Sequence, residues 1–336
     1  MVVLGAGLGL LIAASSTAVV MSRVDDEAGD SNDSTSSAVN ERPEERSITW
    51  RADGQVQIPY GSVDLDAAGD SVWVTNGGTL YRVARSTMSV VDSVELIGAA
   101  YNVSASADSV WVVNNRPFEE VMVVDPDTGE TSEAEYISLP NAVDLEAGAA
   151  WVLGLSSCGR LDPVTATVTL ECSVGGESID ATDDDVWIVG DGLSRLDPQT
   201  GAVVDSTSLP GVGRAVAATR DVVWVVVDSE TSTDLLRIDP TDLAITGTIE
   251  VGAAPEDGYP QGLFASEADV WVTNSTDGTL FHVDPQTVQI TQTLNVGTQP
   301  RGVTATGEDV WVADDWAGPD GETGVVHRVV PDGSNR

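Results

Sequence analysis

The sequence predicts an all-β protein, a seven-bladed β-propeller of four-stranded antiparallel blades. Three observations support this: a tryptophan phrase that recurs seven times, four strand-like segments in each period, and chain ends that supply complementary parts of one blade. The copies are DSVWVTN, DSVWVVN, GAAWVLG, DDVWIVG, DVVWVVV, ADVWVTN and EDVWVAD, centred on Trp73, Trp111, Trp151, Trp187, Trp224, Trp271 and Trp311.

The spacing of the tryptophans, 36 to 47 residues, is shared by helical repeats and propeller blades. Local composition favours the propeller. The segments are short, rich in β-branched residues and interrupted by Gly, Asp, Asn and Pro, which is typical of strands and turns. No stretch of ten or more residues after position 47 keeps a 3.6-residue apolar period, so the repeat is expected to be β.

The sixth period shows the expected strands A, B, C and D of a blade, QGLFAS (261–266), ADVWVTN (268–274), TLFHVDP (279–285) and ITQTLNVG (290–297). The residue eight places before each tryptophan is apolar in all seven periods, and the residue six places before it is small in six. Strand A should therefore be the inner strand, where blades crowd together. Because the tryptophans recur once per blade inside apolar strands, we expect them to pack between blades rather than against a ligand.

The two chain ends should complete one blade. The last period starts at Arg301, supplies strands A, B and C, and then stops at PDGSNR. The segment TWRADGQVQIPYG (49–61) resembles a turn followed by a D strand, with no A, B or C before it. We expect it to complete the seventh blade and to cover an open sheet edge, so that deleting residues 48–60 destabilises the whole ring.

The N-terminal region differs from the repeats. Residues 2–22 carry no charge and have the length of a membrane-spanning helix or signal-peptide core, so 1–22 is interpreted as a signal peptide or membrane anchor. Residues 23–47 are acidic and nearly free of large apolar groups, as in a disordered linker. The propeller would then occupy 48–336 in an extracytoplasmic location, secreted or anchored by the N-terminal segment.

The charge narrows the range of partners. The 336-residue chain has a net charge of −39, and its 15 basic residues are all arginine. Such a surface repels nucleic acid and anionic lipid. Contact with a membrane is expected only through the N-terminal segment, and the chain is expected to be a monomer. The composition leaves open whether the acidity reflects a salty habitat.

The two cysteines, Cys158 and Cys172, lie on either side of the turn at Asp162-Pro163. In an antiparallel hairpin folded at this turn they would face each other across the strands. We expect a disulfide, the alternative being two buried free thiols.

The phrases VWVTN, GTLFHVDPQT, LSRLDPQTGAVV and VGTQPRGVTAT resemble the YVTN family of bacterial seven-bladed β-propellers, and less closely the virginiamycin B lyase-like propellers. The resemblance covers residues 50 to 332. It implies the fold but no particular function, since the repeat is a blade signature. The lyase-like members use a histidine base with a divalent metal. Here His282 and His327 both lie on strand C, next to or within a position that is usually arginine, and match no such base.

That strand C position holds Arg82, Arg160, Arg195, Arg237 and Arg328 in five blades, with His282 and Val123 in the other two. We interpret these arginines as partners of turn carboxylates in their own or a neighbouring blade, rather than as a cationic ring for a ligand. The acidic run at 183–185 falls in a predicted A–B turn and is interpreted as a solvated turn.

The positions just before strand A indicate where a ligand could bind, because propeller loops meet at the mouth of the channel. Ten residues before each tryptophan the chain has Val63, Tyr101, Asn141, Glu177, Arg214, Gln261 and Arg301. The next position has Asp64, Asn102, Ala142, Ser178, Ala215, Gly262 and Gly302. These positions do not repeat as the core positions do. The alternative is a set of solvated loops that bind nothing.

Long loops in the last three blades suggest that a ligand pocket would lie on one side of the channel mouth. The candidate ligand-binding residues are Asp257, Tyr259, Arg301, Asp314, Asp315, Trp316, Arg214 and Glu177. Arg301 could hold a carboxylate, Tyr259 or Trp316 could stack, and the aspartates could hold Ca²⁺ or another divalent cation, although no metal cluster or cofactor motif is evident.

The sequence therefore predicts an extracytoplasmic module that binds an unidentified protein or small molecule at the channel mouth. The alternative is a metal-dependent lyase, lactonase or hydrolase with a carboxylate-lined site at the same mouth.

Overall fold

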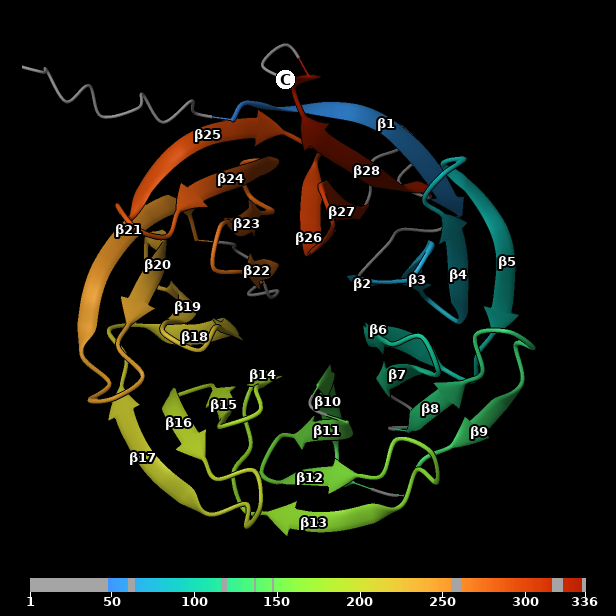
Figure 1. The fold of residues 1–336 in the computed structure, drawn as a ribbon, viewed down its shortest axis with the longest axis horizontal. Helices are drawn as coiled ribbons and strands as arrows, with labels where there is room; N and C mark the ends of the chain where they lie inside the picture. The colour runs from blue at the N-terminus through green and yellow to red at the C-terminus, as the bar shows by residue number, and fades with distance from the viewer. Residues whose placement is uncertain are drawn as a thin grey trace, which may run out of the picture. The chain divides into compact units, whose positions relative to one another are not determined.

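The computed structural model describes residues 48–59, 64–115, 120–135, 137–146, 148–254, 261–315 and 323–333. Within these ranges the chain forms seven antiparallel sheets of four strands each and no α-helix. The sheets are arranged as blades around a central axis (Figure 1). The predicted seven-bladed propeller is confirmed.

Each blade runs from an inner strand A to an outer strand D. Blades 1 and 2 consist of β2 (Asp64–Ala68), β3 (Ser71–Asn76), β4 (Thr79–Ala84) and β5 (Ser89–Glu95), and of β6 (Ala99–Ala105), β7 (Val110–Asn115), β8 (Val121–Val124) and β9 (Thr131–Glu133). Blades 3 and 4 consist of β10 (Pro140–Glu146), β11 (Ala149–Gly154), β12 (Cys158–Leu161) and β13 (Val168–Cys172), and of β14 (Ser178–Ala181), β15 (Val186–Val189), β16 (Gly192–Leu196) and β17 (Val203–Ser208). Blades 5 and 6 consist of β18 (Val212–Ala218), β19 (Val223–Asp228), β20 (Ser232–Ile238) and β21 (Ile245–Ala253), and of β22 (Leu263–Ala265), β23 (Val270–Asn274), β24 (Thr279–Asp284) and β25 (Gln289–Asn295). Blade 7 combines β26 (Gln299–Thr306), β27 (Asp309–Asp315) and β28 (Thr323–Pro331) with β1 (Trp50–Pro59).

Blade 7 closes the ring as the chain ends predicted. Strand β1 pairs antiparallel with β28, from Trp50 opposite Pro331 to Pro59 opposite Thr323. Figure 1 shows β1 as the outer strand beside β28, next to β25 of blade 6. The expected turn at its start is instead part of the strand, and an irregularity between Ala52 and Gly54 accommodates the extra residue.

The seven repeated tryptophans lie in the core between consecutive blades, as predicted. Trp73 of blade 1 packs against Val103 and Val112 of blade 2. Trp311 of blade 7 packs against Leu65 and Val72 of blade 1 and so completes the circuit. All seven are at most 3% exposed. Each interface between blades therefore contains one large buried aromatic side chain.

Three of the strand C arginines, Arg82, Arg195 and Arg328, pack over these tryptophans, as does His282. The guanidinium of Arg328 lies 5.8 Å from the ring centre of Trp311, and its Nη2 donates to Asp309 Oδ1 (2.9 Å). Arg195 lies over Trp187 and donates through Nη1 to the carbonyl oxygen of Pro240 in the next blade (2.8 Å). These contacts support the structural interpretation of the arginines, although the acceptor in the next blade is a turn carbonyl.

In blade 6 His282 takes the place of the arginine. Its ring stacks on Trp271, with ring centres 4.3 Å apart. Its Nε2 forms a hydrogen bond with Asp269 Oδ1 (2.7 Å), and the Thr291 hydroxyl lies 2.7 Å from Nδ1. Both ring nitrogens are therefore engaged in blade packing.

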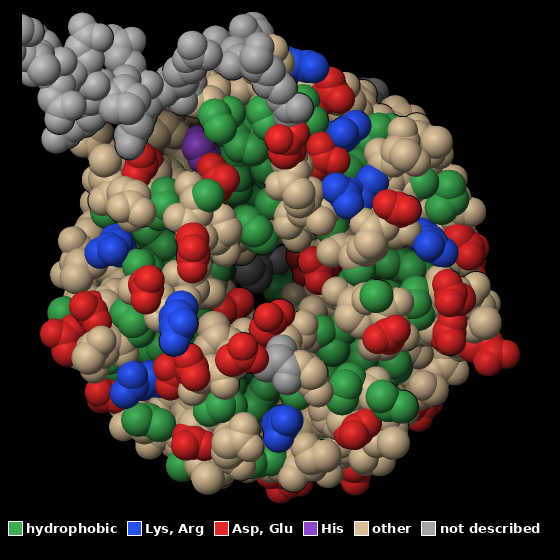
Figure 2. All heavy atoms as spheres, in the orientation of Figure 1, with side chains coloured by type: hydrophobic (Ala, Val, Ile, Leu, Met, Phe, Trp, Pro, Cys, Tyr) green, Lys and Arg blue, Asp and Glu red, His purple; other side chains and the backbone are tan. Residues whose placement is uncertain are grey.

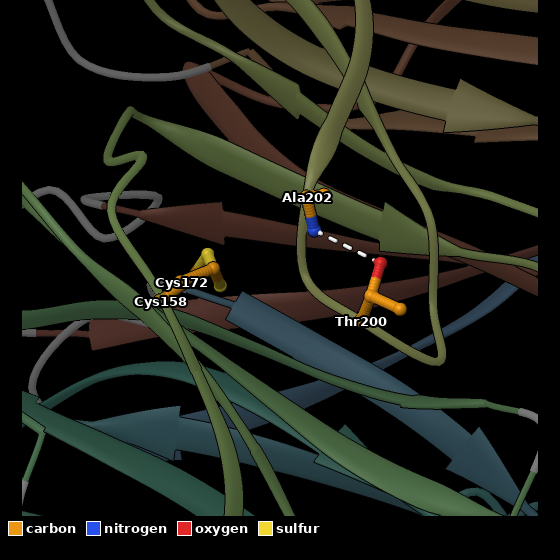
Figure 3. The surroundings of a disulfide bond; sticks show 4 residues. All are labelled: Cys158, Cys172, Thr200 and Ala202. Carbon is orange, nitrogen blue, oxygen red and sulfur yellow. Dashed lines mark hydrogen bonds between the residues drawn. A yellow bond between two sulfur atoms is a disulfide. The ribbon is translucent and has the colours of Figure 1, made fainter.

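The predicted disulfide is present. Cys158 on β12 lies directly opposite Cys172 on β13, and their sulfur atoms are bonded (Figure 3). The turn after β16 packs on this bridge through Gly201, which has φ +66° and whose added Cβ would lie 3.3 Å from that of Cys172. A side chain at Gly201 would be both strained and crowded.

The predictions for residues 1–22 and 23–47 lie outside the described residues. Within the described part of the chain, no helix has the length and apolar character needed to span a bilayer.

Candidate functional site

A cavity of about 160 Å³ lies at the mouth of the central channel, where the chain enters the inner strands. It is lined by Asp64, Tyr101, Asn102, Asn141, Ala142, Glu177, Ser178, Arg214, Ala215, Val216, Gln261, Gly262, Leu263, Arg301, Gly302 and Val303. These residues come from all seven blades and include both sets of positions that precede strand A. Val63 lies outside the described residues. The cavity therefore gathers side chains that differ from blade to blade.

Blade 5 contributes an arginine that is held from one side. The Nε of Arg214 donates to Asp228 Oδ2 (2.8 Å), and the other oxygen, Oδ1, accepts a hydrogen bond from the Thr233 hydroxyl (2.7 Å). Asp228 is buried at the end of β19. Both carboxylate oxygens are thus used, and the charge-assisted bond through Nε restricts the orientation of the guanidinium.

Blade 7 repeats this arrangement. The Nε of Arg301 donates to Asp315 Oδ2 (3.1 Å), and the Arg301 side chain is buried. Asp315 occupies the same position in its blade as Asp228, four residues after the tryptophan. Two guanidinium groups with the same carboxylate support therefore line one cavity.

The wall between and beside the arginines is polar. Gln261 of blade 6 is buried, and its Oε1 accepts a hydrogen bond from the backbone N–H of Ser275 (2.9 Å). In blade 3 the side-chain amide of Asn141 donates to the carbonyl oxygens of Gly176 and Glu177 (3.2 Å each). Glu177, on the blade next to Arg214, places an acidic side chain in the same lining, as does Asp64 of blade 1.

Of the candidate residues, the structure brings Arg301, Arg214 and Glu177 together in the lining and places Asp315 behind Arg301. Asp314 does not line the cavity. It is fully buried, and its Oδ1 accepts hydrogen bonds from the backbone N–H groups of Thr298 (3.0 Å) and Gln299 (2.7 Å), where the chain enters β26. Asp257, Tyr259 and Trp316 lie outside the described residues.

Below the mouth, the channel wall carries carboxylates that the sequence analysis did not single out. Asp66, Asp144 and Asp180 each lie seven residues before a tryptophan, on the inner strand of their blade. Each accepts a hydrogen bond from a backbone N–H of the next blade, at Ala105 (2.8 Å), Ala181 (2.8 Å) and Ala218 (2.9 Å). The signal was available in the strand alternation, because the core residues six and eight places before the tryptophan pack on one face of the blade and leave position seven on the other face, toward the next blade.

Burial shifts the titration of these groups. It raises the pKa of Asp66, and it raises the pKa of Asp144 to about 7, against opposing hydrogen bonds from backbone N–H groups. The pKa of Asp64, at the mouth, is raised to about 7 for the same reason. Burial, and then the nearby Asp144 charge, raise the pKa of Asp180 well above its ordinary value. Each shift has the sign expected for a carboxyl group withdrawn from water.

The far end of the channel opens into a wider acidic cavity of about 620 Å³. Its lining includes Asp144, Glu146, Asp180 and the run Asp183–Asp185, beside Arg220. Figure 2 shows this hollow at the centre of the face, with Asp and Glu side chains gathered over β10 and β14. Among the described residues, no group of three or more His, Cys, Asp or Glu side chains is placed to hold a metal ion.

Comparisons with known proteins inform the fold. No family model matches the chain, and no curated protein matches its sequence. The chain is similar to the solved WD40 β-propeller domain of Doa1, with a TM-score of 0.70 and 10% sequence identity over 85% of this chain and 98% of that one. It is also similar to Kuenenia stuttgartiensis hydrazine synthase, with a TM-score of 0.66 and 11% identity over 80% of this chain and 95% of that one. At such identities the similarity concerns the fold alone.

Proposed function

We propose that this protein is an extracytoplasmic propeller of the YVTN type that binds a ligand or partner in the mouth cavity. The observation that carries the proposal is the convergence of non-repeating polar side chains on one cavity of an otherwise repetitive molecule. A concave site with a few oriented polar groups is the usual form of a ligand site. The Arg214–Asp228 and Arg301–Asp315 pairs supply such groups.

The extracytoplasmic location is part of the proposal. It rests on the uncharged segment 2–22 and on the disulfide between Cys158 and Cys172, a bond that persists in oxidising compartments. Cleavage of the propeller by a protease added to intact cells would support it. Protection that persists when the outer envelope is removed and the cytoplasmic membrane is left intact, together with cleavage after lysis, would contradict it.

A thermal-shift screen of small polar molecules and short peptides tests binding at the mouth. Hits should raise the melting temperature of the wild type and of Arg220→Gln, which alters the opposite opening, but not that of Arg214→Gln. Ligands that raise the melting temperature of Arg214→Gln as much as that of the wild type, or a screen without hits, would contradict the proposal. Repeating the screen with EDTA separates the metal-dependent enzyme, whose ligand-induced shifts would require a divalent cation.

A further inference from the structure

The mouth cavity has an uneven distribution of charge that indicates the chemistry of its ligand. Arg214 and Arg301 lie on blades 5 and 7, on either side of Gln261 of blade 6. Glu177 lies on blade 4, the neighbour of blade 5 on the other side. Asp64 of blade 1 also lines the cavity, but its Oδ2 already accepts hydrogen bonds from the side-chain amide of Asn102 (2.8 Å) and the backbone N–H of Val103 (3.1 Å). A ligand in this cavity therefore meets two guanidinium groups along one part of the wall and the Glu177 carboxylate on the adjoining part.

The arginines are oriented before any ligand arrives. Arg214 donates to Asp228 through Nε. The two terminal Nη groups, at the other end of the planar guanidinium, take no part in this bond. The Thr233 hydroxyl in turn fixes Asp228. A guanidinium held in this way loses little freedom on binding, so a carboxylate placed against it gains a charge-assisted hydrogen bond at low entropic cost.

Glu177 provides the opposite charge, and this charge is not neutralised by an ion pair with the neighbouring Arg214. Within the described residues Glu177 forms no ion pair, and the Arg214 ion pair is with Asp228. A carboxylate that lines a cavity next to a fixed guanidinium suits a ligand that carries a cation close to its own anion.

Size and net charge restrict the ligand further. A cavity of about 160 Å³ has room for several water molecules, the scale of a small amino acid. A simple anion is disfavoured by the net charge of −39, whereas a molecule with no net charge is not. A simple cation is disfavoured because it would meet both guanidinium groups.

From these observations we propose that the mouth binds a small zwitterion of the α-amino acid type, with its carboxylate against Arg214 and Arg301 and its ammonium group against Glu177. This inference rests on the proposed binding function of the mouth and specifies the class of ligand.

Titration calorimetry on the full chain tests the inference with glycine and L-alanine, against propionate as the carboxylate alone and ethylamine as the ammonium alone. The zwitterions should bind roughly tenfold or more tightly than either fragment. Arg214→Gln should weaken both L-alanine and propionate, whereas Glu177→Gln should weaken L-alanine to the level of propionate and leave propionate unchanged. Arg220→Gln, at the opposite opening, should bind like the wild type.

Equal binding of L-alanine and propionate by the wild type, or unchanged L-alanine binding by Glu177→Gln, would overturn the inference. Melting temperatures of both variants within a few degrees of the wild type would show that they are folded. If amino acids fail to bind while other ligands from the screen depend on Arg214, the inference fails and the binding function stands. If nothing depends on Arg214, both fail.

Discussion

At the scale of single residues, one side-chain position of strand A links neighbouring blades. The position seven residues before the tryptophan holds Asp66, Ser104, Asp144 and Asp180 in blades 1 to 4, and each accepts a backbone N–H from the next blade. Blades 5 and 6 have Ala217 and Phe264 there, which cannot accept such a bond. Blades 1 to 4 are therefore linked to their neighbours by hydrogen bonds from the backbone to these side chains. Three of the acceptors are carboxylates, whose charged form burial disfavours.

Asp144→Asn tests the cost of that charge. Burial raises the folded-state pKa of Asp144 to about 7, so its stabilising contribution is fully present below the unfolded value near 4 and is lost as pH rises through about 7. The asparagine keeps an acceptor for the Ala181 N–H but has no charge. We expect the variant to gain roughly 1–3 kcal/mol over the wild type between pH 4 and pH 8, since the channel admits some water.

Urea denaturation across that pH range measures the difference. Asp221→Asn, in an exposed turn, should show almost none of it. A difference between Asp144→Asn and the wild type that does not vary with pH would contradict the prediction.

At the scale of elements, β1 has the greatest influence on the ring because it joins the chain ends. It pairs with β28 along its length, and Trp50 reaches into blade 6. There the backbone N–H of Trp50 donates to Gln292 Oε1 (2.7 Å), Gln292 Nε2 donates to the Trp50 carbonyl oxygen (2.6 Å), and the Trp50 ring lies edge-on to Trp271 (4.9 Å). The strand thus completes blade 7 and also ties it to blade 6.

Removal of residues 48–60 should therefore lower the stability of the whole propeller. The deletion exposes the edge of β28 and removes the buried side chains of Val56 and Ile58 from the core. We expect the urea midpoint to fall sharply in a single transition. As a control, deletion of residues 23–47, the predicted linker, should leave the midpoint nearly unchanged. A β1 deletion that melts like the wild type would show that closure adds little.

Strands β12 and β13 are joined by the disulfide. The double variant Cys158→Ser/Cys172→Ser measures how much the bond contributes to the free energy of unfolding. The bridge closes a loop with a sequence separation of 14, for which chain entropy predicts about 3 kcal/mol. The variant should lose about that much in urea, and the wild type in reductant should lose a similar amount. If reductant leaves the wild-type midpoint in place while the bridge is shown to be broken, the stabilisation is absent.

At the scale of the whole molecule, the two ends of the channel differ in chemistry. The mouth carries oriented guanidinium groups, whereas the far opening is lined by carboxylates. The surface as a whole is strongly acidic, with a net charge of −39. Repulsion among these charges opposes the compact state, and salt screens it because the Debye length falls from about 10 Å at 0.1 M to about 3 Å at 1 M.

The free energy of unfolding should consequently rise as sodium chloride is raised from about 0.05 to about 1 M. Urea denaturation at several salt concentrations near pH 7 measures it. The same series near pH 4, where many carboxylates are protonated, should show a smaller rise. A flat or falling salt dependence at pH 7 would mean that self-repulsion does not limit the stability of this chain.

Much of the architecture was predictable because its signals are local and repeated. The tryptophan phrase, the strand alternation and the turns lie within a few residues of one another, and seven copies make the period visible. The closing strand followed from counting strands at the two ends. The disulfide followed from two cysteines on either side of a turn, since a hairpin brings such positions together.

The sequence alone thus determined the blades, their number, their closure and the level of the ring at which side chains vary. Only the tertiary structure decided which of those side chains meet. It set Asp228 and Asp315 behind their arginines, turned Asp314 into the preceding loop and aligned carboxylates along the channel. The physical reason is that these contacts depend on the direction in which each side chain leaves its strand and on how neighbouring blades pack. Residues on different blades become neighbours only when the ring closes.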